Sequence, residues 1–139
     1  MKNHYKLVLF DLDETLLKGR TIHVVGEKKG FLSEVLRLEE SSIVSYKKNQ
    51  MIAKLLRKIP SQELLDIFRS IPLQDHVIEI MKTLQKKRVK TAIVTNSYQF
   101  LADDLKERLG MDYAVGNVLE IKDGVITGEL VVQNPYLKE

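Results

Sequence analysis

The sequence predicts an α/β fold built on a parallel sheet, and three observations carry this prediction. Residues 6–10 and residues 91–94 are short apolar runs, typical of strands buried on both faces. Stretches with the helical spacing of apolar residues separate and follow these runs. A third strand-like run begins at residue 113. Strands that alternate with helices in this order pair in parallel through right-handed crossovers.

The region between the first two strands is predicted to be helical. Residues 16–30 contain three glycines and mixed polarity, so we expect a loop there that includes a tight turn of helix. From about residue 31 to residue 71, apolar side chains recur at helical spacing, with a break and restart at Pro60 and Ser61. Because this region holds no strand candidate, we expect a small helical unit inserted between two strands.

The second half of the chain completes the alternation. A helix is expected from Asp75 to about residue 87, and a second helix follows the strand at 91–94 and runs from residue 97 to residue 109. The dipeptide Asp123-Gly124 lies between two apolar runs and predicts a hairpin turn.

Composition narrows the classes of function. The chain has 139 residues, which is enough for one domain with a small insertion. It has no cysteine, which excludes disulfides, zinc–thiolate sites and cysteine nucleophiles. The polar N-terminus does not resemble a signal peptide, and no apolar run is long enough for a membrane helix. We therefore expect a cytoplasmic protein with no membrane partner.

The net charge of +3 and pI of about 9.0 raise nucleic-acid binding as an alternative. The basic residues are spread along predicted helices, where cations near the C-terminal ends favour the helix dipole. Aromatic residues make up 6% of the chain and tryptophan is absent, so stacking platforms for bases are not expected. We expect no nucleic-acid partner.

Two aspartates directly follow the first predicted strand. Asp11 and Asp13 are two positions apart, so in extended backbone their side chains point to the same side. Two close carboxylates repel each other unless a cation neutralises them or one of them holds a proton. Mg²⁺ suits such oxygen ligands, and the two groups can then act as a nucleophile and a general acid–base. The alternative is a polar strand exit with local turn hydrogen bonds.

Thr95 follows the second predicted strand. Ligands of parallel sheets bind at the carboxyl ends of strands, so Thr95 is expected near the two aspartates. It also lies at the start of a predicted helix, where a hydroxyl can cap the helix and the N-terminus can bind phosphate.

The segment from Lys6 to Leu16, KLVLFDLDETL, resembles the first motif of the haloacid dehalogenase-like phosphatases. The segment from Thr91 to Ser97, TAIVTNS, resembles their second motif. The helical insert and the run from Leu109 to Gly128 resemble the subgroup that includes phosphoserine phosphatase. The resemblance implies a Rossmann-like three-layer sandwich with a core at residues 1–18 and 73–139. It also implies a loop and helical cap at residues 19–72.

The resemblance also implies a reaction and a cofactor. Asp11 would attack the phosphorus of a small phosphorylated metabolite, and Asp13 would protonate the leaving oxygen and then activate water. The Asp11 carboxylate and the Asp13 backbone carbonyl would hold Mg²⁺. The Thr95 hydroxyl and the Asn96 amide would hold phosphoryl oxygens. The family's third motif, a lysine, has its candidate in Lys138.

Two departures from the family pattern qualify these expectations. No acidic pair of the fourth motif follows Thr95, so the sequence is interpreted as truncated at its C-terminus and as a weaker metal binder. The strand that accompanies that motif would lie beside residues 6–10. Without it those residues form an exposed apolar edge, through which we expect a homo-oligomer or pairing with a partner chain.

The substrate site departs as well. Arg20 stands where phosphoserine phosphatases have a glutamate for the amino group of the substrate. An arginine there repels an ammonium group and suits a second anion, although an exposed loop charge is the alternative. The leading hypothesis is a Mg²⁺-dependent phosphomonoesterase that acts through an aspartyl-phosphate. The alternative is a non-catalytic or incomplete relative that binds a phosphorylated ligand or a partner.

Overall fold

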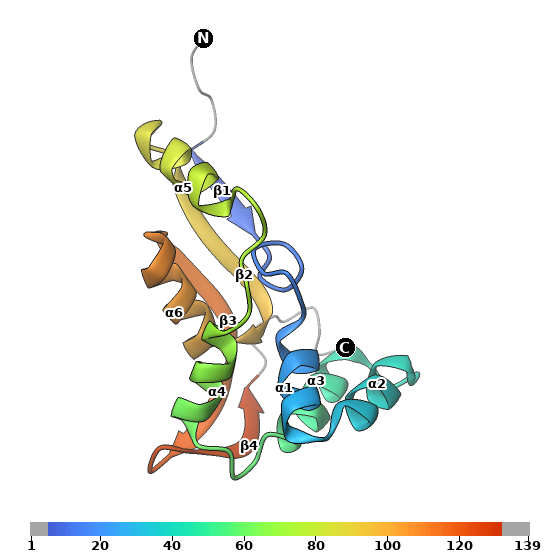
Figure 1. Ribbon diagram of the computed structural model, residues 1–139. Helices are drawn as coiled ribbons and strands as arrows, with labels where there is room; N and C mark the ends of the chain where they lie inside the picture. The colour runs from blue at the N-terminus through green and yellow to red at the C-terminus, as the bar shows by residue number, and fades with distance from the viewer. Residues whose placement is uncertain (1–5, 132–139) are drawn as a thin grey trace.

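A four-stranded sheet forms the centre of the computed structural model, which describes residues 6–131 (Figure 1). The strands lie in the order β1-β2-β3-β4. Their bounds are Leu7–Phe10 for β1, Lys90–Tyr98 for β2, Tyr113–Lys122 for β3 and Val125–Val131 for β4. The first three strands are parallel, and β4 is antiparallel to β3 across the predicted Asp123-Gly124 turn. The predicted α/β, Rossmann-like fold and the hairpin are confirmed.

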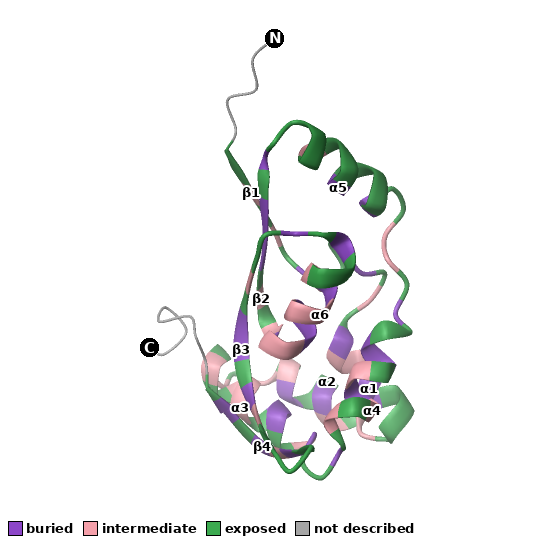
Figure 2. Ribbon diagram, turned by 90° about the vertical axis from the view of Figure 1, so that its left-hand side faces the viewer, coloured by how far each residue is buried: buried purple, intermediate pink, exposed green. Residues whose placement is uncertain are grey.

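Helices cover one face of this sheet. The helices α5 (Val77–Lys86) and α6 (Gln99–Leu109) connect the parallel strands and pack on the same side (Figure 2). The other face carries exposed apolar side chains, among them Leu9, Val94 and Val115. Residues 6–131 therefore supply two of the three expected layers.

Within the described residues, β1 is at an edge of the sheet, since it pairs with β2 alone. Leu7 and Leu9 are 48% and 60% exposed. The expected apolar edge is present, and association through it stays a prediction.

The insert between β1 and β2 consists of four helices. Their bounds are Thr21–Lys29 for α1, Leu32–Glu40 for α2, Ser45–Lys54 for α3 and Ser61–Arg69 for α4. The predicted helical unit is confirmed. Its division from the core at residues 19–72 stays a prediction, because one continuous cluster of buried side chains contains residues of both parts, such as Leu56, Phe68 and Ile93.

The expectation for residues 16–30 is wrong, because α1 is a nine-residue helix and not a tight turn within a loop. Its β-branched residues have low helix propensity, so tertiary contacts must stabilise it. Gly26 lies so close to α2 that a Cβ there would be 3.0 Å from the Cα of Leu32. Gly30 ends the helix in the left-handed conformation, with φ of 87°.

The insert also contacts β4, which lies at the opposite edge of the described sheet from β1. The helix α3 packs against β4, and Pro60 forms an isolated antiparallel bridge with Val125. The N–H of Lys58 donates to the carbonyl oxygen of Ile126 at 2.8 Å. These contacts hold the insert beside the carboxyl ends of the parallel strands.

The second strand is longer than predicted. It runs on to Tyr98, past the predicted segment 91–94, but its regular pairing with β3 ends at Val94. From there β2 advances to Tyr98 while β3 advances only from Val115 to Asn117, so Thr95 lies in an irregular stretch. The following helix begins at Gln99 for the same reason.

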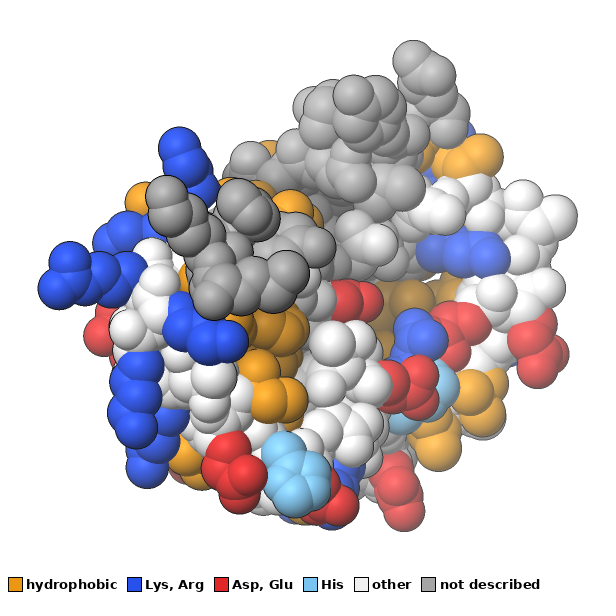
Figure 3. Space-filling view, turned by 90° about the horizontal axis from the view of Figure 1, so that it is seen from above, with side chains coloured by type: hydrophobic (Ala, Val, Ile, Leu, Met, Phe, Trp, Pro, Cys, Tyr) orange, Lys and Arg blue, Asp and Glu red, His pale blue; other side chains and the backbone are white. Residues whose placement is uncertain are grey.

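Basic and acidic side chains lie beside each other on the face seen in Figure 3. No helix among the described residues is long and apolar enough to cross a membrane.

Candidate active site

The loop after β1 presents the two aspartates. Leu12, which lies between them, is fully buried and anchors the loop in the core. Asp11 is exposed, and its Oδ1 accepts a hydrogen bond from the N–H of Leu12 at 2.6 Å. Asp13 is half-buried. The loop closes on itself where the N–H of Glu14 donates to the carbonyl oxygen of Gly19 at 3.1 Å.

Asp13 binds the first turn of α1. Its Oδ1 accepts hydrogen bonds from the N–H of Thr21 at 2.9 Å and from the Thr21 hydroxyl at 2.6 Å. N–H groups in the first turn of a helix lack a partner within the helix, and Arg20 supplies no side-chain cap. The carboxylate of Asp13 therefore caps α1 from another part of the chain, which also fixes the orientation of Asp13.

Burial raises the pKa of the Asp13 carboxyl above its ordinary value. The hydrogen bonds from Thr21 and the charge of Arg20 act in the opposite direction, and Asp11 adds a smaller upward contribution. The net result is a raised pKa, so Asp13 holds a proton to higher pH than an exposed aspartate does. Tyr98 is buried nearby, and burial with the charge of Asp13 raises the pKa of its hydroxyl, which stays neutral.

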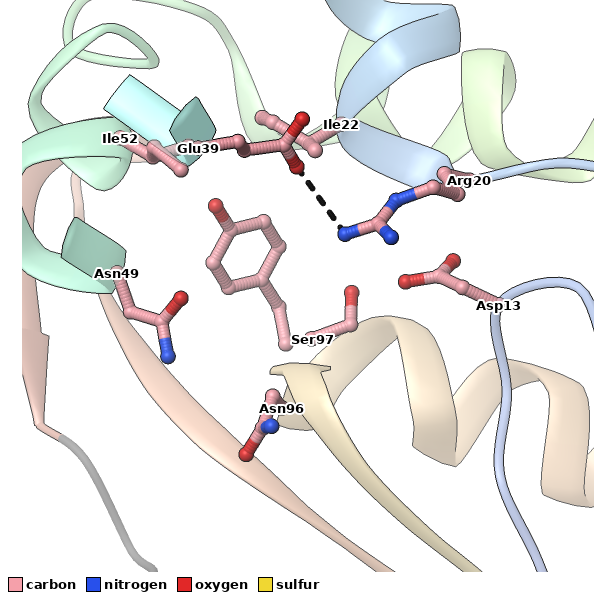
Figure 4. A pocket seen from close by; sticks show the side chains of 9 residues that line it. Asp13, Arg20, Ile22, Glu39, Asn49, Ile52, Asn96 and Ser97 are labelled. Carbon is pink, nitrogen blue, oxygen red and sulfur yellow. Dashed lines mark hydrogen bonds and ion pairs between the residues drawn. The ribbon is translucent and has the colours of Figure 1, made fainter. Parts of the chain in front are cut away.

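A cavity of about 80 Å³ lies between this loop, the end of β2 and the insert (Figure 4). Asp13 faces it from the loop and Arg20 from the start of α1. At the end of β2, the Ser97 side chain points toward Arg20, whereas the Asn96 side chain points away from it (Figure 4). The cavity thus has one wall from strand ends and one wall from the insert.

Charged groups connect the helices that form the insert wall of the cavity. Glu39 of α2 accepts a hydrogen bond from Arg20 Nη2 at 3.1 Å and lies 2.6 Å from His23 Nε2. Its backbone carbonyl oxygen accepts a hydrogen bond from Lys48 Nζ of α3 at 2.9 Å. Lys48, Arg20, Glu39 and Asn49 also line a larger cavity of about 370 Å³ that adjoins the first one. Glu39 therefore joins three helices of the insert at the cavity.

The structure brings part of the predicted site together. Asp13, Arg20 and Asn96 line the same cavity, whereas Asp11 and Thr95 are not among its lining residues. Asp11 nevertheless follows β1, and Thr95 lies in the irregular last part of the neighbouring strand β2. Phe10 of β1 pairs with Ile93 of β2, so both residues lie just past the last β1–β2 pair. The Thr95 hydroxyl accepts a hydrogen bond from the N–H of Ser97 at 3.0 Å.

Lys138 lies outside the described residues. The roles assigned to Asp11, Asp13, Thr95, Asn96, Lys138 and Arg20 stay predictions. Among residues 6–131, no group of three or more His, Cys, Asp or Glu side chains could hold a metal ion.

Sequence analysis did not identify Thr21, Glu39, Asn49 or Ser97. Thr21 was missed because α1 was not predicted, so its position at a helix start was not recognised. Glu39 and Asn49 lie on polar positions of amphipathic helices, and only the packing of those helices turns them toward the cavity. Ser97 had a signal, since it ends the stretch that resembles the second motif.

Comparison with known proteins identifies relatives over most of the chain. The family model described as haloacid dehalogenase-like hydrolase matches residues 8–139. A phosphoserine phosphatase of Archaeoglobus fulgidus is 33% identical over 129 residues, which cover 90% of this chain and 38% of the relative. A phosphoserine phosphatase of Methanocaldococcus jannaschii is 29% identical over 143 residues, which cover 100% of this chain and 67% of the relative.

Solved structures of phosphoserine phosphatase are similar in fold. One in complex with substrate superposes with a TM-score of 0.83 at 26% identity, covering 95% of this chain and 65% of that chain. One with an analogue of the phospho-aspartyl intermediate has a TM-score of 0.82 at 27% identity, covering 94% and 65%.

These matches define what the chain shares with its relatives. It spans 38% of the length of the Archaeoglobus protein and 67% of the Methanocaldococcus protein. The matched region includes β1, the insert, β2 and the hairpin, together with the two aspartates and the cavity beside them. The chain belongs to the haloacid dehalogenase-like hydrolase family.

Proposed function

We propose that this chain carries the site of a phosphomonoester hydrolase that acts on a small phosphorylated metabolite through an aspartyl-phosphate. The observation that carries the proposal is the half-buried Asp13 carboxyl with its raised pKa, two residues after the exposed Asp11 at the end of β1. The relatives named phosphoserine phosphatase support the reaction class.

In the first step, a carboxylate oxygen of Asp11 attacks the phosphorus and the bond from phosphorus to the ester oxygen breaks. Asp13 donates its proton to the departing oxygen, so that an alcohol leaves rather than an alkoxide. The raised pKa favours this role, because the acid must still hold its proton when the bond breaks. Its two hydrogen bonds to Thr21 keep the carboxyl oriented.

In the second step, Asp13 is ionised and takes a proton from a water molecule. The water oxygen attacks the phosphorus, the acyl-phosphate bond breaks, and inorganic phosphate and free Asp11 are released. Asp13 thus recovers its proton and the cycle closes. The N-terminal end of α6 and the Thr95 hydroxyl lie at the neighbouring strand end, where they can bind phosphoryl oxygens.

The donor set at the end of β1 fits Mg²⁺ in kind, because carboxylate and carbonyl oxygens are the hard ligands this ion prefers. Asp11 would hold it through its exposed carboxylate and Asp13 through its backbone carbonyl. When bound, the ion would neutralise negative charge on the phosphoryl group. One or two carboxylates with several waters are a common arrangement for Mg²⁺.

Hydrolysis of a nitrophenyl phosphate in millimolar Mg²⁺ tests the proposal. The substitution Asp11→Asn removes the nucleophile and is expected to lower turnover by about 10³-fold or more. A matched control is Asp75→Asn, which changes an exposed aspartate paired with Lys18 and is expected to leave turnover unchanged. Turnover that survives Asp11→Asn, or is absent in the unmodified chain, contradicts the proposal.

Association through the exposed edge of β1 is a separate proposal, supported by Leu7 and Leu9. A monomeric mass in sedimentation equilibrium at micromolar concentration contradicts self-association.

A further inference from the structure

The larger cavity beside the candidate active site has a distinctive set of charges. Arg20, Lys48 and Glu39 line it, together with Asn49 and uncharged side chains. It adjoins the smaller cavity that Asp13 faces, and Arg20 and Glu39 belong to both. A phosphoester whose phosphorus lies near Asp11 and Asp13 therefore extends its leaving group toward Arg20 and Lys48.

Glu39 is already engaged by its neighbours. One carboxylate oxygen accepts a hydrogen bond from Arg20 at 3.1 Å, and the other lies 2.6 Å from His23 Nε2. The Glu39 side chain is 24% exposed. An incoming ammonium group would have to approach Glu39 beside Arg20, whose positive charge opposes it.

Arg20 and Lys48 retain capacity for an anion. A guanidinium has five N–H donors, and among the described residues Arg20 has one side-chain partner, Glu39. Lys48 donates to a neutral acceptor, the Glu39 carbonyl, and none of the described carboxylates lies within ion-pair distance of it. The wall thus carries two cations for one carboxylate, and its balance is positive.

We propose that the phosphoester taken by this site carries a second anionic group, a carboxylate or a second phosphate, which binds between Arg20 and Lys48. The inference rests on the proposed phosphatase function, because that function places the phosphoryl group at the strand ends. It goes beyond that function in naming the leaving-group class and in assigning a binding role to Lys48. Amine-bearing phosphoesters bind more weakly, because their charge is opposite to what this wall favours.

Three phosphonates of equal chain length test the inference on the unmodified protein without turnover. Phosphonopropionate ends in a carboxylate, propylphosphonate in a methyl group and aminopropylphosphonate in an ammonium group. A carbon replaces the ester oxygen in each, so none is hydrolysed. Calorimetric titration at neutral pH is expected to show phosphonopropionate binding about tenfold tighter than propylphosphonate, as a charge-assisted hydrogen bond would give, and aminopropylphosphonate binding weakest.

Variants assign the preference to the two cations. Lys48→Met and Arg20→Met are each expected to remove most of the tenfold preference and to leave propylphosphonate affinity within about twofold. Lys48→Arg keeps the charge and is expected to retain the preference. The control Lys47→Met changes an exposed lysine of the same helix and should alter neither affinity.

Three outcomes overturn the inference. Aminopropylphosphonate could bind as tightly as phosphonopropionate or more tightly, none of the three phosphonates could bind, or the preference for phosphonopropionate could survive both methionine variants. Failure of the proposed function is a different result. In that case the carboxylate preference persists, while nitrophenyl phosphate hydrolysis is absent or insensitive to Asp11→Asn.

Discussion

The two walls of the cavity are built in different ways. On the strand side, Asp13 follows β1 and Ser97 lies in the last part of β2, and the pairing of these parallel strands determines where they lie. On the insert side, Glu39 belongs to α2, Asn49 belongs to α3, and Arg20 immediately precedes α1. These three side chains meet only because the helices pack together. The strand wall is thus set by the pairing of two neighbouring strands, whereas the insert wall depends on how separate helices pack together.

The substitution Asp13→Asn alters the strand wall of the cavity and has the largest expected effect of the substitutions described below. An amide cannot donate the proton of the first step, so kcat for an alkyl phosphate is expected to fall by about 10²- to 10⁴-fold. The loss should be smaller for a nitrophenyl phosphate, whose leaving oxygen needs no proton. Steady-state kinetics on both esters measure the difference. Equal losses on the two esters would mean that Asp13 is not the acid.

The substitution Gly26→Ala disturbs the packing of α1 against α2 in the insert. The added Cβ would meet the backbone of Leu32 at 3.0 Å, so α1 and α2 must move apart. The usual cost of overpacking exceeds the roughly 1 kcal/mol that alanine gains over glycine in a helix, so we expect the free energy of unfolding to fall by about 1–2 kcal/mol. Urea denaturation measures it.

The control for this variant is Glu27→Ala, at an exposed position of the same helix, with an expected change within about 0.5 kcal/mol. If Gly26→Ala is as stable as this control, the close approach of α1 and α2 does not constrain the insert.

The same contrast explains how much of the molecule could be predicted from its sequence. Strands β1 and β2, the Asp123-Gly124 hairpin and the helical nature of the insert were predicted because periodicity and turn residues act locally. The helix α1 was missed because its β-branched residues give a weak helical signal, while the contacts that stabilise it, the bonds from Thr21 to Asp13 and packing on α2 and α4, are tertiary.

Glu39 shows the limit most clearly. It looks like one of several surface acids in an amphipathic helix, and no spacing rule marks it. Only the approach of α1 and α3 makes it the partner of Arg20, His23 and Lys48. Arg20 was singled out from the sequence as an anion site, but its ion pair with Glu39 could not be predicted.

Asp13→Asn also separates stability from activity. The folded protein holds the Asp13 proton more tightly than the unfolded chain does, because burial raises the pKa above its ordinary value of 3.8. The stability that Asp13 contributes is therefore present in full below pH 3.8 and is lost as pH rises through the raised pKa. Asparagine keeps an oxygen acceptor for Thr21 and cannot ionise.

The variant should therefore gain stability relative to the native protein as pH rises from 3.8 through the raised pKa of Asp13. Denaturant unfolding at several pH values measures the gain, with Asp75→Asn as the exposed control. A stability difference that does not change with pH would mean that Asp13 titrates alike in both states.

Thr21 joins the two walls, since it belongs to α1 and binds the carboxyl that follows β1. The Thr21 hydroxyl lowers the pKa of Asp13, so Thr21→Val is expected to raise that pKa further. The first step requires protonated Asp13, so the alkaline limb of kcat/KM should move to higher pH, by less than about one unit for one hydrogen bond of ordinary strength. Thr21→Ser keeps the hydroxyl and should leave the limb in place. A shift of the alkaline limb in both variants would point to packing. A shift in Thr21→Val alone would mean that a residue of the insert adjusts the pKa of the acid on the strand wall, so that the two walls are not independent.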